Sequence, residues 1–205
     1  MTQGPIASRR GGFTGSGGYI SVDIEASGPT PARYSMLSVG ACLVDDPARN
    51  FYAELQPTST QSDPEAMAVH GLSLQALQLS GLPPAEVMGA FDRWLREVCP
   101  PPVRPVFVAY NAPFDWMFVH DAFLNALGRD PFGHTALDIR TMYVGWSGRP
   151  WLEVRFDELA QRYLGSRRLT HNALEDALAQ AEIMRGLMEE MAGGVIRGGT
   201  VVADR

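Results

Sequence analysis

The chain has 205 residues, which is enough for one well-packed domain but leaves little length for a second domain. All seventeen basic residues are arginine, so a P-loop lysine, a Schiff-base lysine and a lysine general base are excluded. The net charge of −6 repels nucleic acid at long range, which disfavours a protein that coats long strands. It is compatible with an enzyme that holds only a few terminal nucleotides.

Both ends of the chain are expected to be flexible tails. Residues 1–18 are rich in Gly, Ser and Thr and lack the hydrophobic stretch of a secretory signal, and residues 193–205 form a second loose end. Residues 19–192 are predicted to form one domain. No apolar run reaches the length of a membrane span, so we expect a cytoplasmic protein without a membrane partner. Cys42 and Cys99 are expected to be buried free thiols.

Three strands are predicted at the start of this domain. In Tyr19–Glu25, apolar and polar side chains alternate as in a half-buried strand. Two further apolar strands follow at Met36–Val44 and Asn50–Leu55, joined by a polar turn at Asp45-Asp46-Pro47. Because the connections are short, the three strands are expected to form an antiparallel meander.

Helices and strands alternate in the rest of the domain, which predicts an α/β fold with a mixed sheet. The expected elements are helices at Pro64–His70 and Pro84–Val98, a strand at Val106–Tyr110, a helix at Phe114–Leu127, a strand at Thr135–Ile139, and helices near 154–164 and 173–191.

Two carboxylates lie at the end of the first predicted strand. Asp23 and Glu25 are two residues apart, so both side chains emerge on the same face of the strand. Adjacent like charges in a half-buried position are unfavourable unless a cation lies between them. Oxygen ligands favour Mg²⁺ or Mn²⁺ over zinc. Taken alone, the pair is also compatible with a solvated strand end.

A third carboxylate, Asp115, lies in the first turn of a predicted helix that follows a buried strand. It has a purely structural interpretation, in which Asp115 stabilises the helix dipole and Asn111 caps the helix. The last predicted helix carries a fourth carboxylate. Asn172 is expected to cap it, so that His171 lies in the preceding loop, free to point into a cleft, while Asp176 projects from the first turn.

Together these segments resemble the three motifs of the DEDDh exonucleases, the DnaQ-like group with a ribonuclease H-like fold. The motifs are Asp-x-Glu from Asp23, the helix-start Asp115, and His-x-Ala-x-x-Asp-Ala from His171. Leu37-Ser38-Val39-Gly40-Ala41 and Val69-His70-Gly71-Leu72 are similar to further segments of the family. The resemblance implies an α/β fold with a ribonuclease H-like, mixed five-stranded sheet flanked by helices.

The resemblance also implies a metal-dependent 3′–5′ exonuclease that releases 5′-mononucleotides from single-stranded RNA or DNA. Asp23, Glu25, Asp115 and Asp176 would hold two Mg²⁺ or Mn²⁺ ions around the scissile phosphate. His171 would take a proton from the attacking water. The residues expected to contact the 3′-terminal nucleotide are Ala26, Ser27, Gly28, His70, Asn111 and Phe114.

Two features depart from the family pattern. The segment Ala26-Ser27-Gly28-Pro29 stands where many relatives have Thr-Thr-Gly or Met-Thr-Gly, and Tyr110 replaces a common histidine. The segment Arg129-Asp130-Pro131-Phe132 is similar to the ribonuclease T branch. The His171 motif is also similar to the proofreading subunit of bacterial replicative polymerases. The sequence therefore leaves RNA and DNA open as substrates.

Several questions of partnership also stay open. A non-catalytic module that holds nucleic-acid ends is an alternative to an enzyme. A proofreader bound to a polymerase is disfavoured because the short tails contain no docking segment. A homodimer is compatible with the family. Arg167 and Arg168 are interpreted either as phosphate contacts or as solvated surface.

Overall fold

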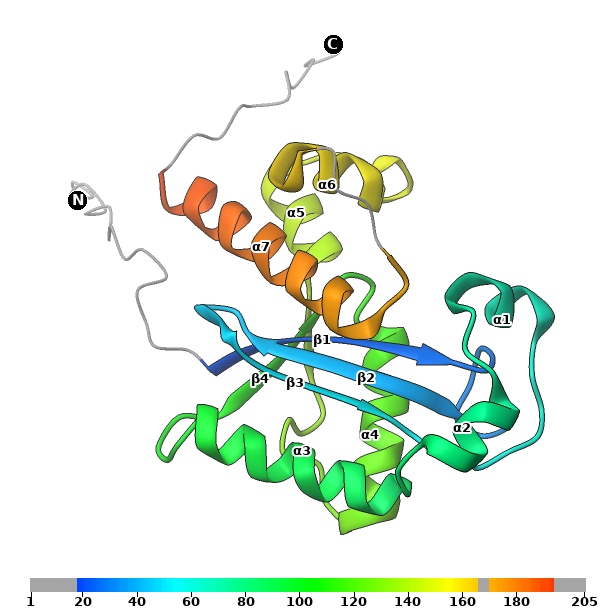
Figure 1. Cartoon of the computed structure of the whole chain (residues 1–205). Coiled ribbons are helices and arrows are strands. Elements are labelled where there is room, and N and C mark those ends of the chain that lie inside the picture. Colours follow the sequence, from blue (N-terminus) through cyan, green and yellow to red (C-terminus); the bar gives the residue numbers. More distant parts are fainter. Residues whose placement is uncertain (1–17, 166–169, 194–205) are drawn as a thin grey trace, which may run out of the picture.

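The protein contains a five-stranded mixed sheet with the strand order β3-β2-β1-β4-β5 (Figure 1). The structure is a computed structural model and describes residues 18–165 and 170–193. β1 pairs antiparallel with β2, and β2 with β3, whereas β1 with β4 and β4 with β5 are parallel. The predicted meander and mixed sheet are confirmed. The strands are β1 (Gly18–Ala26), β2 (Met36–Leu43), β3 (Asp46–Glu54), β4 (Pro105–Ala109) and β5 (Ala136–Asp138).

Helices cover both faces of the sheet (Figure 1). On one face, α3 (Pro84–Val98) and α4 (Pro113–Leu127) pack on a core around Phe91, Phe107 and Phe123. On the other face, α7 (Ala173–Ala192) crosses β1 and β2, with α5 (Ile139–Ser147) and α6 (Phe156–Leu164) beside it. The short helices α1 (Pro64–His70) and α2 (Leu74–Ser80) lie beyond the C-terminal end of β1, and a 3₁₀ turn, η1 (Trp151–Glu153), precedes α6.

Some element boundaries differ from the sequence predictions. β3 begins at Asp46, so the turn after β2 consists of Val44 and Asp45 alone. Pro47 is tolerated within β3 because β3 is an edge strand, where one backbone N–H can be missing. β5 ends at Asp138, and Ile139 belongs to α5 instead, because the Asp138 carboxylate caps that helix by accepting from Thr141 N (2.6 Å).

The helices α2 and α5 and the turn η1 were not predicted. Both helices are short, and their helical period is difficult to distinguish from loop sequence. The predicted flexibility of both tails and the predicted roles of Arg167 and Arg168 fall on residues 1–17, 166–169 and 194–205, which lie outside the described residues. No helix in the described part of the chain combines the length and apolarity needed to cross a membrane. Cys42 and Cys99 are buried free thiols, as predicted.

Gly40 allows α7 to lie close against the sheet. A Cβ atom at this position would lie 2.2 Å from the backbone carbon of Ala173, the first residue of α7. Gly40 is also the antiparallel partner of Asp23 across β1 and β2. The absence of a side chain therefore brings the first turn of α7, with Asp176, next to the carboxylates of β1.

Candidate active site

One open pocket of about 240 Å³ contains all five residues predicted to be catalytic or metal-binding. It lies where β1 extends past β4, since the last parallel pair between these strands is Ser21 with Val108. The ends of α4 and α7 supply its other walls. The residues that line it are Asp23, Ile24, Glu25, Tyr110, Asn111, Phe114, Asp115, His171 and Asp176.

Asp115 ties the start of α4 to β1. Its Oδ1 accepts a hydrogen bond from the backbone N–H of Ile24 at 3.1 Å, in a buried position. This N–H belongs to the part of β1 that extends beyond the printed pairs with β4. The carboxylate therefore holds the α4 terminus against the strand at the edge of the pocket.

Asp176 organises the loop that carries His171. Its two carboxylate oxygens accept from the backbone N–H groups of Thr170 (2.9 Å) and His171 (3.0 Å). Asn172 caps α7 as predicted, because its side-chain oxygen accepts from the N–H groups of Leu174 and Glu175. His171 has a φ of 57°, a left-handed conformation that is uncommon outside glycine.

The closest side-chain group in the pocket consists of Glu25, Asp176 and His171. One carboxylate oxygen from each acid and a ring nitrogen of His171 all lie within 4.8 Å of one another. Glu25 and Asp176 are buried, whereas His171 is exposed. A divalent cation at this position would have oxygen and nitrogen ligands available from two chain segments.

The four carboxylates have raised pKa values because they are buried together. Burial raises the pKa of Asp23 well above its ordinary range, and the charges of Asp115, Asp176 and Glu25 raise it further. Burial, followed by the charges of Asp176 and Asp115, raises the pKa of Glu25 to about 8. The pKa values of Asp115 and Asp176 are also raised, chiefly by burial. The pocket therefore lacks the positive charge that would balance four ionised carboxylates.

Two residues that support the site were missed in the sequence analysis. Gln180 is buried on α7, one turn after Asp176, and its amide donates to Asp23 Oδ1 at 2.6 Å. Its carbonyl oxygen accepts from Tyr110 N at 2.6 Å. The available signal was a polar residue four positions after Asp176, on the same face of a predicted helix. Asp138 accepts from Ala112 N at 2.8 Å and so fixes the turn before α4.

Asn111 and Phe114 line the pocket beside the carboxylates. The capping role considered for Asn111 is wrong, because Ala112 occupies the N-cap position of α4 and no side chain caps this helix end. Asn111 instead has a φ of 64°, and it is the only described non-glycine residue besides His171 with a positive φ. Phe114 is 40% exposed, although it lies beside a buried carboxylate. Its ring is free to contact a ligand at the mouth of the pocket.

Four of the residues predicted to contact the nucleotide are not among the nine that line the pocket. They are Ala26, Ser27, Gly28 and His70. Ser27 is fully buried, its N–H donates to Ser35 O (2.8 Å) and its C=O accepts from Asp63 N (2.7 Å). Gly28 packs so closely on Tyr34 that a Cβ would lie 2.4 Å from the ring. The backbone oxygen of Ala26 lies 3.2 Å from His70 Nε2. The contacts of these residues with a nucleotide stay predictions.

His70 has a defined tautomer in this arrangement. Its Nδ1 accepts from Leu72 N at 3.0 Å, so the proton is on Nε2, which donates to the Ala26 carbonyl. Burial lowers the pKa of His70, in agreement with a neutral ring. Both ring nitrogens are therefore engaged within the protein, and His70 holds the end of α1 against β1.

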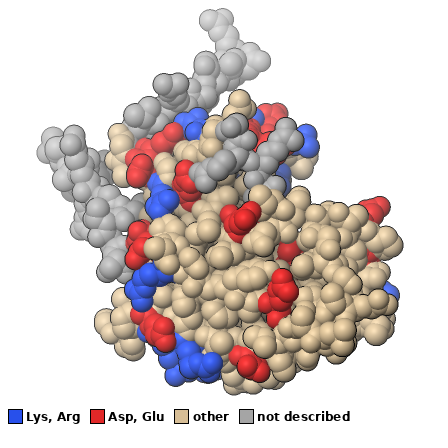
Figure 2. Space-filling view, in the orientation of Figure 1, with Lys and Arg blue, Asp and Glu red and all other residues tan. Residues whose placement is uncertain are grey.

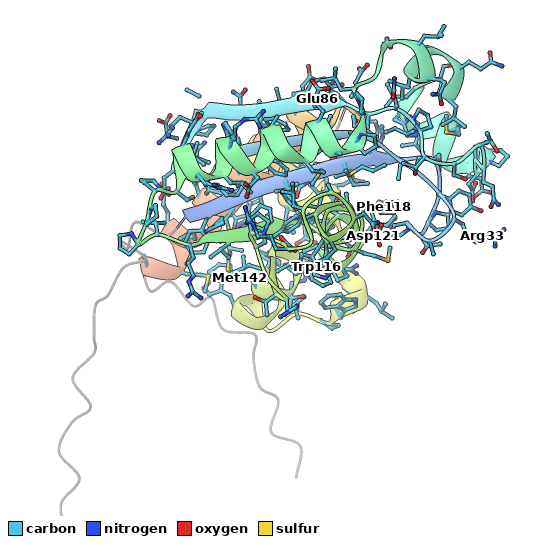
Figure 3. The ribbon with its side chains drawn as sticks, turned by 90° about the horizontal axis from the view of Figure 1, so that it is seen from below. Arg33, Glu86, Trp116, Phe118, Asp121 and Met142 are labelled. Carbon is cyan, nitrogen blue, oxygen red and sulfur yellow. The ribbon has the colours of Figure 1, made fainter. Side chains whose placement is uncertain are left out.

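Larger hollows lie elsewhere and lack such a carboxylate cluster. A cavity of about 320 Å³ lies between α4 and the loop after β1, and Figure 3 labels Phe118 and Asp121 of its α4 wall. A groove of about 980 Å³ lies along α1 and α2 and is lined by no acidic residue. On the face in Figure 2, arginines lie mainly along one edge, carboxylates are scattered over the face, and most of the surface is uncharged. The chemistry therefore points to the smaller pocket.

Comparison with known proteins agrees with the geometry. Residues 20–184 match the exonuclease family RNase_T. The chain is 44% identical over 167 residues to the 3'-5' DNA exonuclease Cap18 of Escherichia coli, a match that covers 82% of this chain and 89% of the relative.

Solved structures share the fold. The nuclease domain of 3'hExo, a DEDDh family member bound to rAMP, is similar with a TM-score of 0.68 at 13% identity, over 84% of this chain and 92% of that one. S. pombe Pop2p in a Mg²⁺- and Mn²⁺-bound form has a TM-score of 0.62 at 16% identity, over 87% of this chain and 86% of that one. By its family match and its 44% identical relative, the chain belongs to the RNase T exonuclease family and is a DEDDh-type 3′–5′ exonuclease.

Proposed function

We propose that this exonuclease degrades single-stranded DNA from the 3′ end with two divalent ions and releases 5′-mononucleotides. The observation that carries the proposal is the convergence of four carboxylates and His171 on one open pocket. DNA is the proposed polymer because the 44% identical relative is named a DNA exonuclease. Residues 19–192 are the proposed catalytic domain. Association with a polymerase or with a second copy stays a prediction.

The residues present fit divalent cations. No arginine lines the pocket, so none of its lining side chains offsets the four carboxylates except the histidine. Carboxylate oxygen ligands favour Mg²⁺ or Mn²⁺ among the common ions. Asp23, Glu25, Asp115 and Asp176 are the proposed ligands. When bound, two such ions supply positive charge at the scissile phosphate and lower the pKa of an attacking water.

The protein's own groups orient the reactants and move the proton. His171 is the proposed general base, because imidazole accepts protons near neutral pH and this ring lies in a loop at the pocket. The hydrogen bond from His171 N to Asp176 keeps that loop next to the carboxylates. Water attacks phosphorus while His171 takes its proton, the P–O3′ bond to the preceding nucleotide breaks, the O3′ of the shortened strand takes up a proton from solvent, and the terminal nucleotide is released as a 5′-monophosphate.

The test compares 5′-labelled single-stranded DNA and RNA of the same sequence, with Mg²⁺, Mn²⁺ or a chelator. We expect stepwise shortening from the 3′ end that requires the metal and is faster on DNA. The Asp23→Asn variant is the matched control and should leave both strands intact. Cleavage that persists in chelator would contradict the metal mechanism. Tight binding of ends without cleavage by the wild-type protein would indicate a non-catalytic binding module instead.

A further inference from the structure

The 3₁₀ turn η1 exposes two large apolar side chains. Trp151 is 43% exposed and Leu152 is 86% exposed. Each of the other three tryptophans is less exposed than Trp151. Neighbouring apolar side chains of this size on a surface are a common sign of a binding site.

An arginine without an ion-pair partner supports this tryptophan. The guanidinium carbon of Arg140 lies 4.6 Å from the centre of the Trp151 ring, and Nη2 donates to the Trp151 carbonyl at 2.8 Å. Arg140 forms no salt bridge with any residue that the structure describes. In a chain with a net charge of −6, an unbalanced cation beside an exposed indole favours an anionic, aromatic ligand.

The Trp151–Arg140 pair is connected to the wall of the active-site pocket. Tyr110 lines that pocket, its hydroxyl donates to the carbonyl of Val154 (3.4 Å), and Val154 follows η1 directly. Arg140 lies two residues after Asp138, whose carboxylate fixes the turn before α4. Both residues of the pair are thus attached to segments that shape the pocket, at the C-terminal ends of β4 and β5.

We propose that Trp151 and Arg140 bind the substrate strand upstream of its terminal nucleotide. Trp151 stacks on a nucleobase and Arg140 contacts a backbone phosphate, a combination suited to single-stranded nucleic acid of any sequence. The inference rests on the proposed function, since the ligand is the same strand whose 3′ end enters the carboxylate pocket. In this proposal, Arg140 supplies the local positive charge that an exonuclease with a net charge of −6 needs to bind a negatively charged strand.

The test separates the upstream site from the catalytic pocket by substrate length. One substrate is a single-stranded DNA dodecamer, and the other is the p-nitrophenyl ester of thymidine 5′-monophosphate, which has no upstream nucleotide. We expect Trp151→Ala to raise KM for the dodecamer about tenfold and to leave ester hydrolysis unchanged. Trp151→Phe should restore most of the affinity, because a smaller aromatic ring still stacks.

A control variant and a second test variant accompany this comparison. Leu79→Ala removes a side chain on α2 that is 89% exposed, and it should change the cleavage rate of neither substrate. Arg140→Gln should lower the dependence of log affinity on log salt concentration by about 0.7 for a single strand. Thermal unfolding of each variant confirms that the fold is retained.

Three outcomes would overturn the proposal. If Trp151→Ala cleaves the dodecamer as well as wild type, the tryptophan does not bind the strand. If Trp151→Ala loses the same share of its activity on the ester as on the dodecamer, Trp151 acts on the catalytic pocket alone. If Trp151→Ala keeps full activity but converts a dimer to a monomer in size-exclusion chromatography, the surface binds a second copy. Failure of the wild-type protein on both substrates would instead contradict the proposed function itself.

Discussion

The side-chain amide of Gln180 donates to Asp23 Oδ1 at 2.6 Å, while its carbonyl oxygen accepts from the backbone N–H of Tyr110 at 2.6 Å. One buried amide therefore joins α7, β1 and the end of β4 at the active site. Because an amide nitrogen can only donate, its hydrogen bond lowers the pKa of Asp23 and partly offsets the effect of burial. Gln180 is a positioning residue for the proposed metal ligand.

Replacing Gln180 by leucine should weaken metal binding and activity together. The change leaves Tyr110 N and Asp23 without a buried partner, which costs roughly 1–3 kcal/mol for each group. We expect a higher half-saturating Mn²⁺ concentration by calorimetry and a kcat about tenfold lower. Gln180→Glu has the same shape but faces Asp23 with a carboxylate, so it should be more severely affected. Unchanged Mn²⁺ binding by Gln180→Leu would contradict the positioning role.

The proposed general base predicts a pH-dependent defect. His171→Ala should reduce kcat by about 10²–10⁴-fold near neutral pH, with activity recovering as pH rises because hydroxide replaces the missing base. The measurement is a pH–rate profile on single-stranded DNA at saturating Mg²⁺. A variant as fast as wild type near neutral pH would remove His171 from the mechanism.

Asp176→Asn should abolish activity for two separate reasons. It removes a proposed metal ligand, a loss on the order of 10³-fold or more in kcat. It also places an amide NH₂ where Asp176 now accepts from the N–H groups of Thr170 and His171. We expect no recovery at high pH, in contrast to His171→Ala. Measurable cleavage that increases with pH would show that Asp176 is dispensable for metal binding.

The raised pKa of Glu25 predicts how pH affects the metal-free protein. Burial, followed by the charges of Asp176 and Asp115, raises this pKa from 4.5 to about 8. Between these values the folded state binds more protons than the unfolded state. The stability from this group is therefore full below the lower value and is lost as pH rises through about 8.

We therefore expect the unfolding temperature of the chelator-treated wild type to fall more steeply with pH across that window than that of Glu25→Gln. Added Mg²⁺ should raise the wild-type unfolding temperature most at the alkaline end, where the carboxylates are ionised. Parallel pH dependences for the two proteins would show that Glu25 is not protonated in the metal-free fold.

The close approach of α7 to β2 predicts a strong effect of a single methyl group. Gly40→Ala would place a Cβ 2.2 Å from the backbone of Ala173, so α7 must shift, at a cost of about 1–3 kcal/mol. Urea unfolding should show this loss, and kcat should fall because Asp176 moves with the helix. Gly89→Ala is the matched control. Its Cβ meets only Arg93 Nη1 at 3.7 Å, and alanine should stabilise α3. Equal stability of both variants would contradict the packing argument.

Local signals in the sequence were sufficient for most of the fold. The apolar stripe of α3 reports which face is buried, and the cap at Asn172 marks the start of α7. The prediction that β1 is half-buried is wrong, because α7 covers the polar face and seven of the nine residues are buried. The helix α5 was missed because its start depends on Asp138 at the end of a three-residue strand, and that strand forms only by pairing with β4. Such an element is defined by its neighbours, not by its own period.

The order and spacing of Asp23, Glu25, Asp115, His171 and Asp176 carry the family pattern, so the candidate catalytic groups could be predicted from the sequence. The contacts that support them became visible only in the folded structure. Gln180 reaches Asp23 across 157 positions, and Ile24 N reaches Asp115 across 91. A hydrogen bond of this kind depends on the packing of helices on the sheet, which no local pattern encodes. The same packing gives both ring nitrogens of His70 a hydrogen-bond partner within the protein. It also brings Tyr110, which lines the pocket, together with the segment of η1 and with Arg140.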